Sequence, residues 1–169
     1  MNINKFTQKS IEAVQACEKL AYEYGNQQME QEHLLGSLLM LEDSLILKLI
    51  TKMNINGNQF LDEVKQALNK LPKVSGGQLY VSNDLNKVLI HGEDEAKAMG
   101  DEYVSVEHLF LAMLKEPSRS IKELFRQYGL TRENFLKALS SVRGNQRVVS
   151  DNPEVTYDTL EKYGYDLVD

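Results

Sequence analysis

Two Glu-His-Leu triplets hold the residues whose types and spacing could perform chemistry in this chain. Glu32-His33-Leu34 and Glu107-His108-Leu109 each place a carboxylate beside an imidazole, the groups that serve general acid–base catalysis and zinc binding. A zinc-protease sequence would carry a second histidine one helical turn further on, and neither triplet has one. We therefore interpret His33 and His108 as hydrogen-bonding residues at helix starts. The chain is expected not to be an enzyme, and a small hydrolase using one Glu-His pair is the least favoured alternative.

A binding role fits four residues that pair up at equivalent places in the chain. Thr7 with Glu32, and Ser82 with Glu107, would each join the N-terminal end of one helix to that of the next. Helix N-termini expose unpaired N–H groups, and a glutamate beside them can accept a guanidinium. Asp101 lies before the second pair as a turn residue or a further anionic contact. These five residues are the predicted substrate-binding positions. The alternative is that Thr7 and Ser82 are ordinary N-caps and that the glutamates merely favour helix starts.

Other reactive groups are few. The single cysteine, Cys17, cannot form an internal disulfide and has no second thiolate for a metal, so we expect a small buried residue on a helix. His91 is expected at the surface. No GxxxxGK[ST] loop occurs, which excludes a phosphate-binding loop of that type from these residues. We predict no metal and no cofactor here.

The acidic composition limits the partners and the location. With a net charge of -6 and a pI near 5.2, the chain shows no Lys/Arg stripe for nucleic acid. The first residues lack a basic region followed by an apolar run, and no 18-residue apolar stretch occurs, so we predict neither signal peptide nor membrane span. The expected location is the cytoplasm.

An internal repeat organises the chain. Sliding the sequence by 75 residues brings Glu32-His33-Leu34 onto Glu107-His108-Leu109 and Phe60-Leu61 onto Phe135-Leu136 without a gap. Glycines that would end helices also match, Gly25 with Gly100. The sequence therefore predicts one duplicated unit.

Each unit reads as four short helices, because apolar residues recur at helical spacing behind good N-caps. The expected helices are residues 8–24, 33–41, 45–53 and a fourth after Asn56, then 83–99, 108–114, 120–128 and a fourth after Thr131. No segment alternates with period two, so we predict no sheet. The fold class is all-α, with two tandem pseudo-symmetric four-helix repeats packed into one domain.

Proline and glycine mark the boundaries. Pro72 and the pair Gly76-Gly77 punctuate a linker at 70–81, between repeat one at 4–69 and repeat two at 82–143. Residues 144–169 change in composition and are expected to be a connector to a further domain. The double-repeat domain is thus predicted at 1–143.

These residues resemble the amino-terminal domain of Clp chaperones. The resemblance spans 1–169 and rests on the paired Glu-His-Leu triplets, the Gly-Asp-Glu-Tyr-Val-Ser run at 100–105, the linker at 71–76 and the tail at 142–144. Within that family the tail is similar to the ClpB-type disaggregase at Arg143-Gly144, Arg147-Val148, 152–154, Tyr157, 160–164 and 166–167. The protease-linked ClpC type usually has a different connector.

The resemblance implies a mobile, non-catalytic domain at the rim of a homohexameric, ATP-driven machine that threads aggregated proteins and cooperates with the DnaK system. ATP and Mg²⁺ would bind only in the absent ATPase modules, and the isolated domain would be monomeric. In ClpB-type domains, positions matching Thr7, Asp101 and Glu107 are implicated in substrate engagement beside an apolar groove. In ClpC-type domains, the Thr7/Glu32 and Ser82/Glu107 positions form twin phosphoarginine sites.

Two binding functions follow. The leading hypothesis is recruitment of unfolded or aggregated polypeptides for threading; the alternative is adaptor docking or phosphoarginine recognition in a protease-linked Clp unfoldase. Charged docking would be salt-sensitive and apolar capture would not. One departure is Gly92, where the family usually has a small side chain such as alanine. It should cost its helix about 1 kcal/mol and could loosen the neighbouring groove.

Overall fold

Eight α-helices make up most of the chain in the computed structural model, which describes residues 3–74, 76–144 and 148. A 3₁₀ turn η1 (Ile3–Lys5) comes first. The helices are α1 (Gln8–Glu23), α2 (Gln31–Met40), α3 (Leu45–Lys52), α4 (Gly57–Lys70), α5 (Asn83–Ala98), α6 (Val106–Lys115), α7 (Arg119–Gln127) and α8 (Arg132–Arg143). The prediction of an all-α fold is confirmed.

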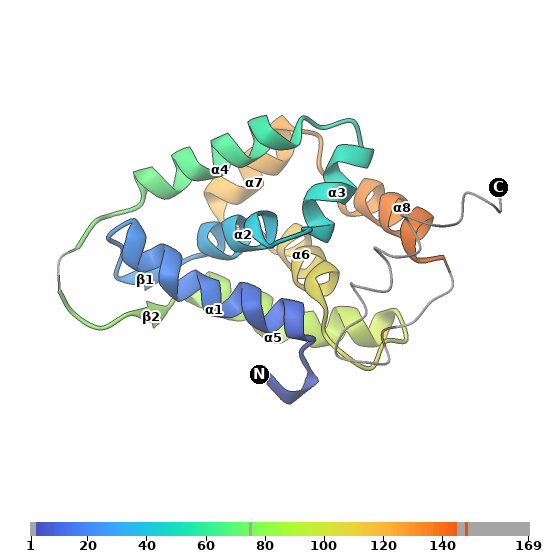
Figure 1. Ribbon diagram of the computed structural model, residues 1–169, viewed down its shortest axis with the longest axis horizontal. Coiled ribbons are helices and arrows are strands. Elements are labelled where there is room, and N and C mark those ends of the chain that lie inside the picture. Colours follow the sequence, from blue (N-terminus) through green and yellow to red (C-terminus); the bar gives the residue numbers. More distant parts are fainter. Residues whose placement is uncertain (1–2, 75, 145–147, 149–169) are drawn as a thin grey trace.

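The duplication is visible in the positions of these helices. α5, α6 and α8 each begin 75 residues after α1, α2 and α4, and α7 begins 74 residues after α3. In Figure 1, α1 and α5 run along one side of the molecule, α4 and α7 lie on the opposite side, and α2 and α6 lie between them. The prediction of two four-helix repeats packed into one domain is confirmed.

Side-chain caps fix the helix ends where the sequence predicted them. Thr7, Asn56, Ser82 and Thr131 each accept a hydrogen bond from the backbone N–H three residues later. Such caps satisfy one of the unpaired donors of a helix N-terminus, each contributing about 1 kcal/mol.

The second helix of each repeat begins two residues earlier than predicted, at Gln31 and Val106. His33 and His108 are the third helical residues, and their Nδ1 atoms accept hydrogen bonds from the N–H groups of Glu30 and Ser105, both at 2.8 Å. Histidine thus takes the part of the usual glutamate or glutamine of a capping box. The interpretation of both histidines as hydrogen-bonding residues at helix starts is confirmed.

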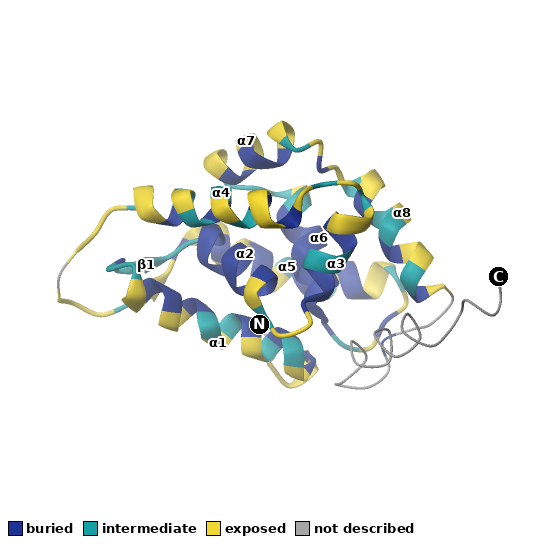
Figure 2. Cartoon of the chain, turned by 45° about the horizontal axis from the view of Figure 1, so that its top comes forward, coloured by how far each residue is buried: buried dark blue, intermediate teal, exposed yellow. Residues whose placement is uncertain are grey.

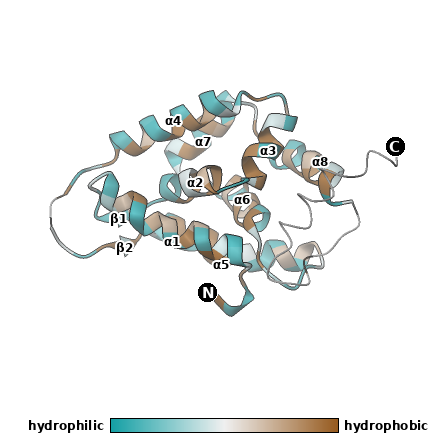
Figure 3. Ribbon diagram, viewed as in Figure 1, coloured by the Kyte–Doolittle hydropathy of each residue, from teal (hydrophilic) through white to brown (hydrophobic). Residues whose placement is uncertain are grey.

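The core runs through both repeats as one apolar cluster. Figure 2 shows α2 and α6 almost entirely buried between the outer helices, and Figure 3 shows that they are rich in hydrophobic residues. Every residue from Gln31 to Leu39 and from Val106 to Met113 is buried. A helix that is apolar nearly all round must be covered on all sides, as predicted.

Gly92 lies where α5 passes close to α6. A Cβ atom at this position would stand 3.0 Å from Leu109 Cδ2 and 3.1 Å from Val104 Cγ1. Both neighbours are almost fully buried, so they have little room to move. The glycine therefore permits a close helix contact, and the packing beside it is tight rather than loosened.

The prediction of no sheet is wrong in one small detail. β1 (Gln28–Met29) pairs in parallel with β2 (Tyr80–Val81), joining the segment before α2 to the segment before α5. Each strand has only two residues, so no alternating pattern could develop in the sequence. A single Phe6–Val104 bridge forms the matching contact between the segments before α1 and α6.

Candidate functional site

The two repeats are joined by exchanged contacts at their helix starts. The Thr7 N–H donates to the carbonyl of Val104, in repeat two, at 2.9 Å, and the Ser82 N–H donates to the carbonyl of Met29, in repeat one, at 3.0 Å. The backbone at Thr7 is thus tied to the segment leading into Glu107, and the backbone at Ser82 to the segment leading into Glu32. The expected pairing of Thr7 with Glu32 and Ser82 with Glu107 is wrong, because strand-like pairing between repeats brings together segments far apart in the chain.

Thr7 and Ser82 are buried N-caps, with 0% and 4% of their surface exposed. The Thr7 hydroxyl bonds the Ser10 N–H, and the Ser10 hydroxyl in turn donates to the Val104 carbonyl at 2.8 Å. Burial raises the pKa of Glu30, the N-cap of α2, while a hydrogen bond with Ser82 opposes that rise. Both hydroxyls therefore serve the junctions between the repeats.

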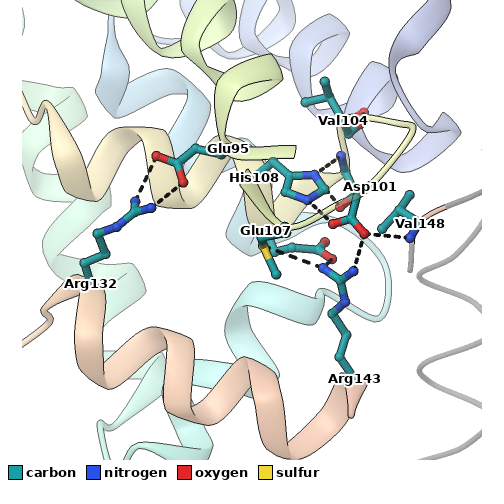
Figure 4. Close-up of polar contacts among 11 residues, drawn as sticks. Glu95, Asp101, Val104, Glu107, His108, Arg132, Arg143 and Val148 are labelled. Atoms are coloured by element: carbon teal, nitrogen blue, oxygen red, sulfur yellow. Dashed lines mark hydrogen bonds and ion pairs between the residues drawn. The ribbon is translucent and has the colours of Figure 1, made fainter. Parts of the chain in front are cut away.

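Asp101 is the centre of a buried polar cluster at the repeat-two end of the molecule (Figure 4). Its carboxylate accepts hydrogen bonds from His108 Nε2 at 2.6 Å, from the Val148 N–H at 2.9 Å and from the Arg143 guanidinium. The bond from the Ser105 N–H to His108 Nδ1 leaves the ring proton on Nε2, where it points at Asp101. Burial alone would raise the pKa of Asp101, but these hydrogen bonds and the Arg143 charge hold it well below its usual range.

Glu107 lies in the same cluster, on the first turn of α6. Its side chain is completely buried, and neither carboxylate oxygen accepts a hydrogen bond within the described part of the chain. Arg143 Nη1 lies 3.6 Å from Glu107 Oε2, so one guanidinium faces two carboxylates (Figure 4). The structure thus brings the predicted residues Asp101 and Glu107 together, in an environment where charges are costly unless paired.

Repeat one has a different version of this cluster. His33 Nε2 contacts Asn26 Oδ1 at 2.8 Å, and Asn26 Nδ2 donates to the Pro72 carbonyl at 3.0 Å. Burial lowers the pKa of His33 to about 4. The residue that matches Arg143 is Leu68, which is fully buried. Repeat one therefore has no arginine at the place where Arg143 faces the glutamate in repeat two.

Glu32, the counterpart of Glu107, opens into a cleft between α4 and α7. Its Oε2 accepts a hydrogen bond from the Ser120 hydroxyl at 2.5 Å, and the residue keeps 5% of its surface exposed. The cleft has a volume of about 380 Å³. Its lining combines apolar side chains with carboxylates: Glu32, Glu63, Gln66, Ala67, Lys70, Leu71, Ser120, Glu123, Leu124 and Gln127.

Gln31 positions one wall of this cleft. Its Nε2 donates to the carbonyls of Asp84 and Glu116, at 3.1 and 3.0 Å, and its Oε1 accepts from the Ser118 N–H at 2.8 Å. These bonds join the start of α2 to α5 and to the turn before α7. A buried side chain that satisfies three backbone groups holds the turn in one place.

The sequence predicted a binding role for Glu32 but gave none to Arg143 or to the other residues of the cleft. The sequence did contain a signal for Arg143, because the 75-residue register aligns this arginine with Leu68, a core residue. Cleft-lining residues such as Glu63 and Glu123 read as ordinary surface charges and gave no signal.

Ser105 Oγ lies 3.1 Å from His108 Nδ1, and His108 Nε2 lies 2.6 Å from Asp101, but all three residues are buried. Within residues 3–74, 76–144 and 148, no three His, Cys, Asp or Glu side chains are arranged to hold a metal. Cys17 is buried, and burial raises its pKa to about 12, which leaves the thiol protonated. His91 Nδ1 contacts Glu116 at 2.5 Å, with 40% of its side chain exposed. Among the described helices, none has the length and apolar character needed to cross a membrane.

Comparison with known proteins shows where this fold and sequence occur. The "Clp repeat (R) N-terminal domain" family matches residues 5–128. The chaperone protein ClpB of Nitratidesulfovibrio vulgaris is 42% identical over 175 residues, covering 100% of this chain and 20% of that protein, so this chain spans about a fifth of its length.

Solved structures share the fold. The Hsp104 N-terminal domain of Candida albicans superposes with a TM-score of 0.78 at 24% identity, covering 89% of this chain and 99% of that one. A ClpV N-domain in complex with a VipB peptide superposes with a TM-score of 0.64 at 23% identity, covering 82% and 86%.

Proposed function

We propose, from the premise that this chain belongs to the Clp repeat (R) N-terminal domain family, that it recruits unfolded or aggregated polypeptides to an ATP-driven disaggregase. The family is a non-catalytic domain of ClpB-type chaperones, and the similarity to ClpB extends along the whole chain. In this proposal the threading machine is a homohexamer that works with the DnaK system in the cytoplasm, and its ATP and Mg²⁺ bind in ATPase modules outside this chain.

The α4–α7 cleft is the observation that carries the proposal. Ala67, Leu71 and Leu124 supply apolar surface, and Glu32 and Glu63 supply carboxylates. Glu123 also lines the cleft but pairs with Arg126. Such a cleft suits a segment of an unfolded chain that combines apolar and basic side chains. Such segments are covered in folded proteins and exposed in unfolded ones.

The size of the cleft suits weak capture. Burial of apolar surface gains about 25 cal/mol per Å², while ordering a flexible segment costs about 0.5–1.5 kcal/mol per immobilised side chain. A cleft of about 380 Å³ holds only a few side chains. Micromolar or weaker affinity is therefore expected, which allows release to the threading machine.

A titration with a permanently unfolded protein, such as reduced and alkylated α-lactalbumin, tests the proposal by residue-resolved NMR. Shifts should cluster along α4 and α7, and binding should weaken only in part when salt is raised, because salt screens the carboxylate contacts but not the apolar ones. Ala67→Glu places a charge on the apolar lining and should weaken binding at least about tenfold, the effect of roughly 1.4 kcal/mol. Ala98→Glu, the same change on an exposed helical position far along α5, is the matched control. Binding that is unaffected by Ala67→Glu would contradict the proposed cleft.

Adaptor docking or phosphoarginine recognition is the second candidate, and one observation favours it. The Glu32 carboxylate at the cleft could pair with a guanidinium, and Ser82, at the start of α5, is tied by its backbone to the segment leading into Glu32. A fold relative, the ClpV N-domain, has been solved with a peptide. Binding only to a folded adaptor or a phosphoarginine peptide, with strong salt dependence, would establish this function in place of polypeptide capture. Glu107→Ala is a poor test because Glu107 is completely buried.

A further inference from the structure

The two repeats differ in the residues that surround the glutamate of their second helix. α4 ends its buried face with Leu68, and α8 carries Arg143 at the matching place. Both side chains are buried, yet one is apolar and the other is a cation that cannot lose its proton. A cation at a core position calls for a specific partner.

We propose that Arg143 is the chain's own ligand for a guanidinium site in repeat two, formed by Asp101 and Glu107. Its Nη2 donates to Asp101 Oδ1, and its Nη1 faces Glu107 Oε2 at 3.6 Å. Only 2% of the Arg143 side chain is exposed, and the two carboxylate side chains are fully buried. The site recognises the planar, forked cation that pairs best with carboxylates.

The occupied site also holds Val148. The same Asp101 oxygen that faces Arg143 accepts from the Val148 N–H, and the Val148 carbonyl accepts from the Glu102 N–H at 2.8 Å. Loss of the guanidinium would leave two buried carboxylates close together, and their repulsion would disturb this junction. Arg143 thus fixes Val148 against the loop between α5 and α6.

The consequence is that the twin sites are not equivalent. Repeat two is filled from within, whereas Glu32 in repeat one opens into the α4–α7 cleft. An external guanidinium can enter repeat two only when Arg143 is removed or withdrawn. This inference does not depend on polypeptide capture, because it is tested with the domain and a small cation alone.

Chemical rescue of Arg143→Ala tests the inference. Removing one partner of a buried ion pair should raise the unfolding equilibrium constant about 100-fold or more. Guanidinium chloride at about 20 mM should lower it again by about tenfold if the cation binds the vacated site with a Kd of about 2 mM. Sodium chloride at equal ionic strength should not. Arg126→Ala removes an exposed guanidinium that pairs with Glu123 and is the matched control, for which no rescue is expected.

A second variant keeps the test decisive if Arg143→Ala does not fold. Asp101→Asn with Arg143→Ala leaves Glu107 as the one carboxylate of the site, which lowers the repulsion between buried charges while the space of the guanidinium stays vacant. Guanidinium should then cause saturable NMR shifts at the amides of Glu107 and His108, and adding Glu107→Gln should abolish them. The wild-type protein should show no such shifts, since its site is filled.

Three results would overturn the inference. The first is that Arg143→Ala is as stable as the wild type. The second is a loss of stability that guanidinium chloride and sodium chloride restore equally. The third is that guanidinium causes identical NMR shifts in the wild type and in the variant that combines Asp101→Asn with Arg143→Ala. Retention of the Val148 and Glu102 amide shifts in Arg143→Ala would contradict the part that concerns Val148.

Discussion

His33 should make the stability of this domain sensitive to mild acid, and His33→Gln should remove that sensitivity. The ring is fully buried, its Nδ1 accepts from the Glu30 N–H, and its Nε2 contacts Asn26. Protonation would add a buried charge and turn the accepting Nδ1 into a donor facing another donor. The folded protein therefore resists taking up this proton.

The magnitude follows from the two pKa values of His33. Burial lowers the folded value to about 4, against the reference 6.5 of an unfolded chain. A lowered histidine pKa contributes stability that is complete above pH 6.5 and is lost as the pH falls towards 4. At pH 4.5 the loss is about 2.5 kcal/mol, a large share of a typical free energy of unfolding.

Urea unfolding of both proteins between pH 7.5 and 4.5 measures this effect. Gln is one of the two residues that usually fill the third helical position of a capping box, so His33→Gln can keep the bond to the Glu30 N–H. The wild type should lose about 2.5 kcal/mol more than His33→Gln over this range. Glu30, whose pKa burial raises, acts in the opposite direction in both proteins, so the difference between them is the quantity to compare.

Asp101 does not confuse the comparison. Its pKa is held below the usual range, so its contribution is present above the unfolded value of 3.8 and is lost only below it. Parallel pH dependences for the wild type and His33→Gln would refute the reasoning. So would an NMR titration in which the His33 ring changes charge near pH 6.5.

Three further predictions concern packing and caps. Gly92→Ala should lower the free energy of unfolding by about 1 kcal/mol, because overpacking against Leu109 and Val104 outweighs the better helix propensity of alanine. Gly36→Ala should raise it by up to about 1 kcal/mol, because the added Cβ meets its nearest neighbours at 3.4 Å. Urea midpoints equal to that of the wild type would contradict both predictions. Cys17 should not react with a thiol reagent at pH 8 until the protein unfolds, and fast labelling of the native state would refute its burial. Thr7→Ala and Ser82→Ala should each lower the free energy of unfolding by about 1 kcal/mol, whereas no change would show that neither cap contributes.

Local features of this protein were readable in the sequence. The caps at Thr7 and Ser82 and the 75-residue duplication depend on residues a few positions apart or on matches along the chain. His33 and His108 were understood as helix-start residues for the same reason, although the helices begin two residues earlier. Side-chain caps and helical periodicity act within a turn or two, so one sequence contains them completely.

Tertiary structure alone decided how these pieces meet. The partners of Thr7 and Ser82 come from the other repeat, through backbone bonds to Val104 and Met29 that leave no trace in residue types. The match of Arg143 to the core residue Leu68 in the 75-residue register hinted that its side chain turns inward, but only the structure shows what it contacts there. An arginine on a helix reads as a surface charge, and only packing brings it to Asp101 from 42 residues away along the chain. Distant segments pair and become buried according to how whole helices pack against one another. A pattern of neighbouring residues along the chain does not specify that packing.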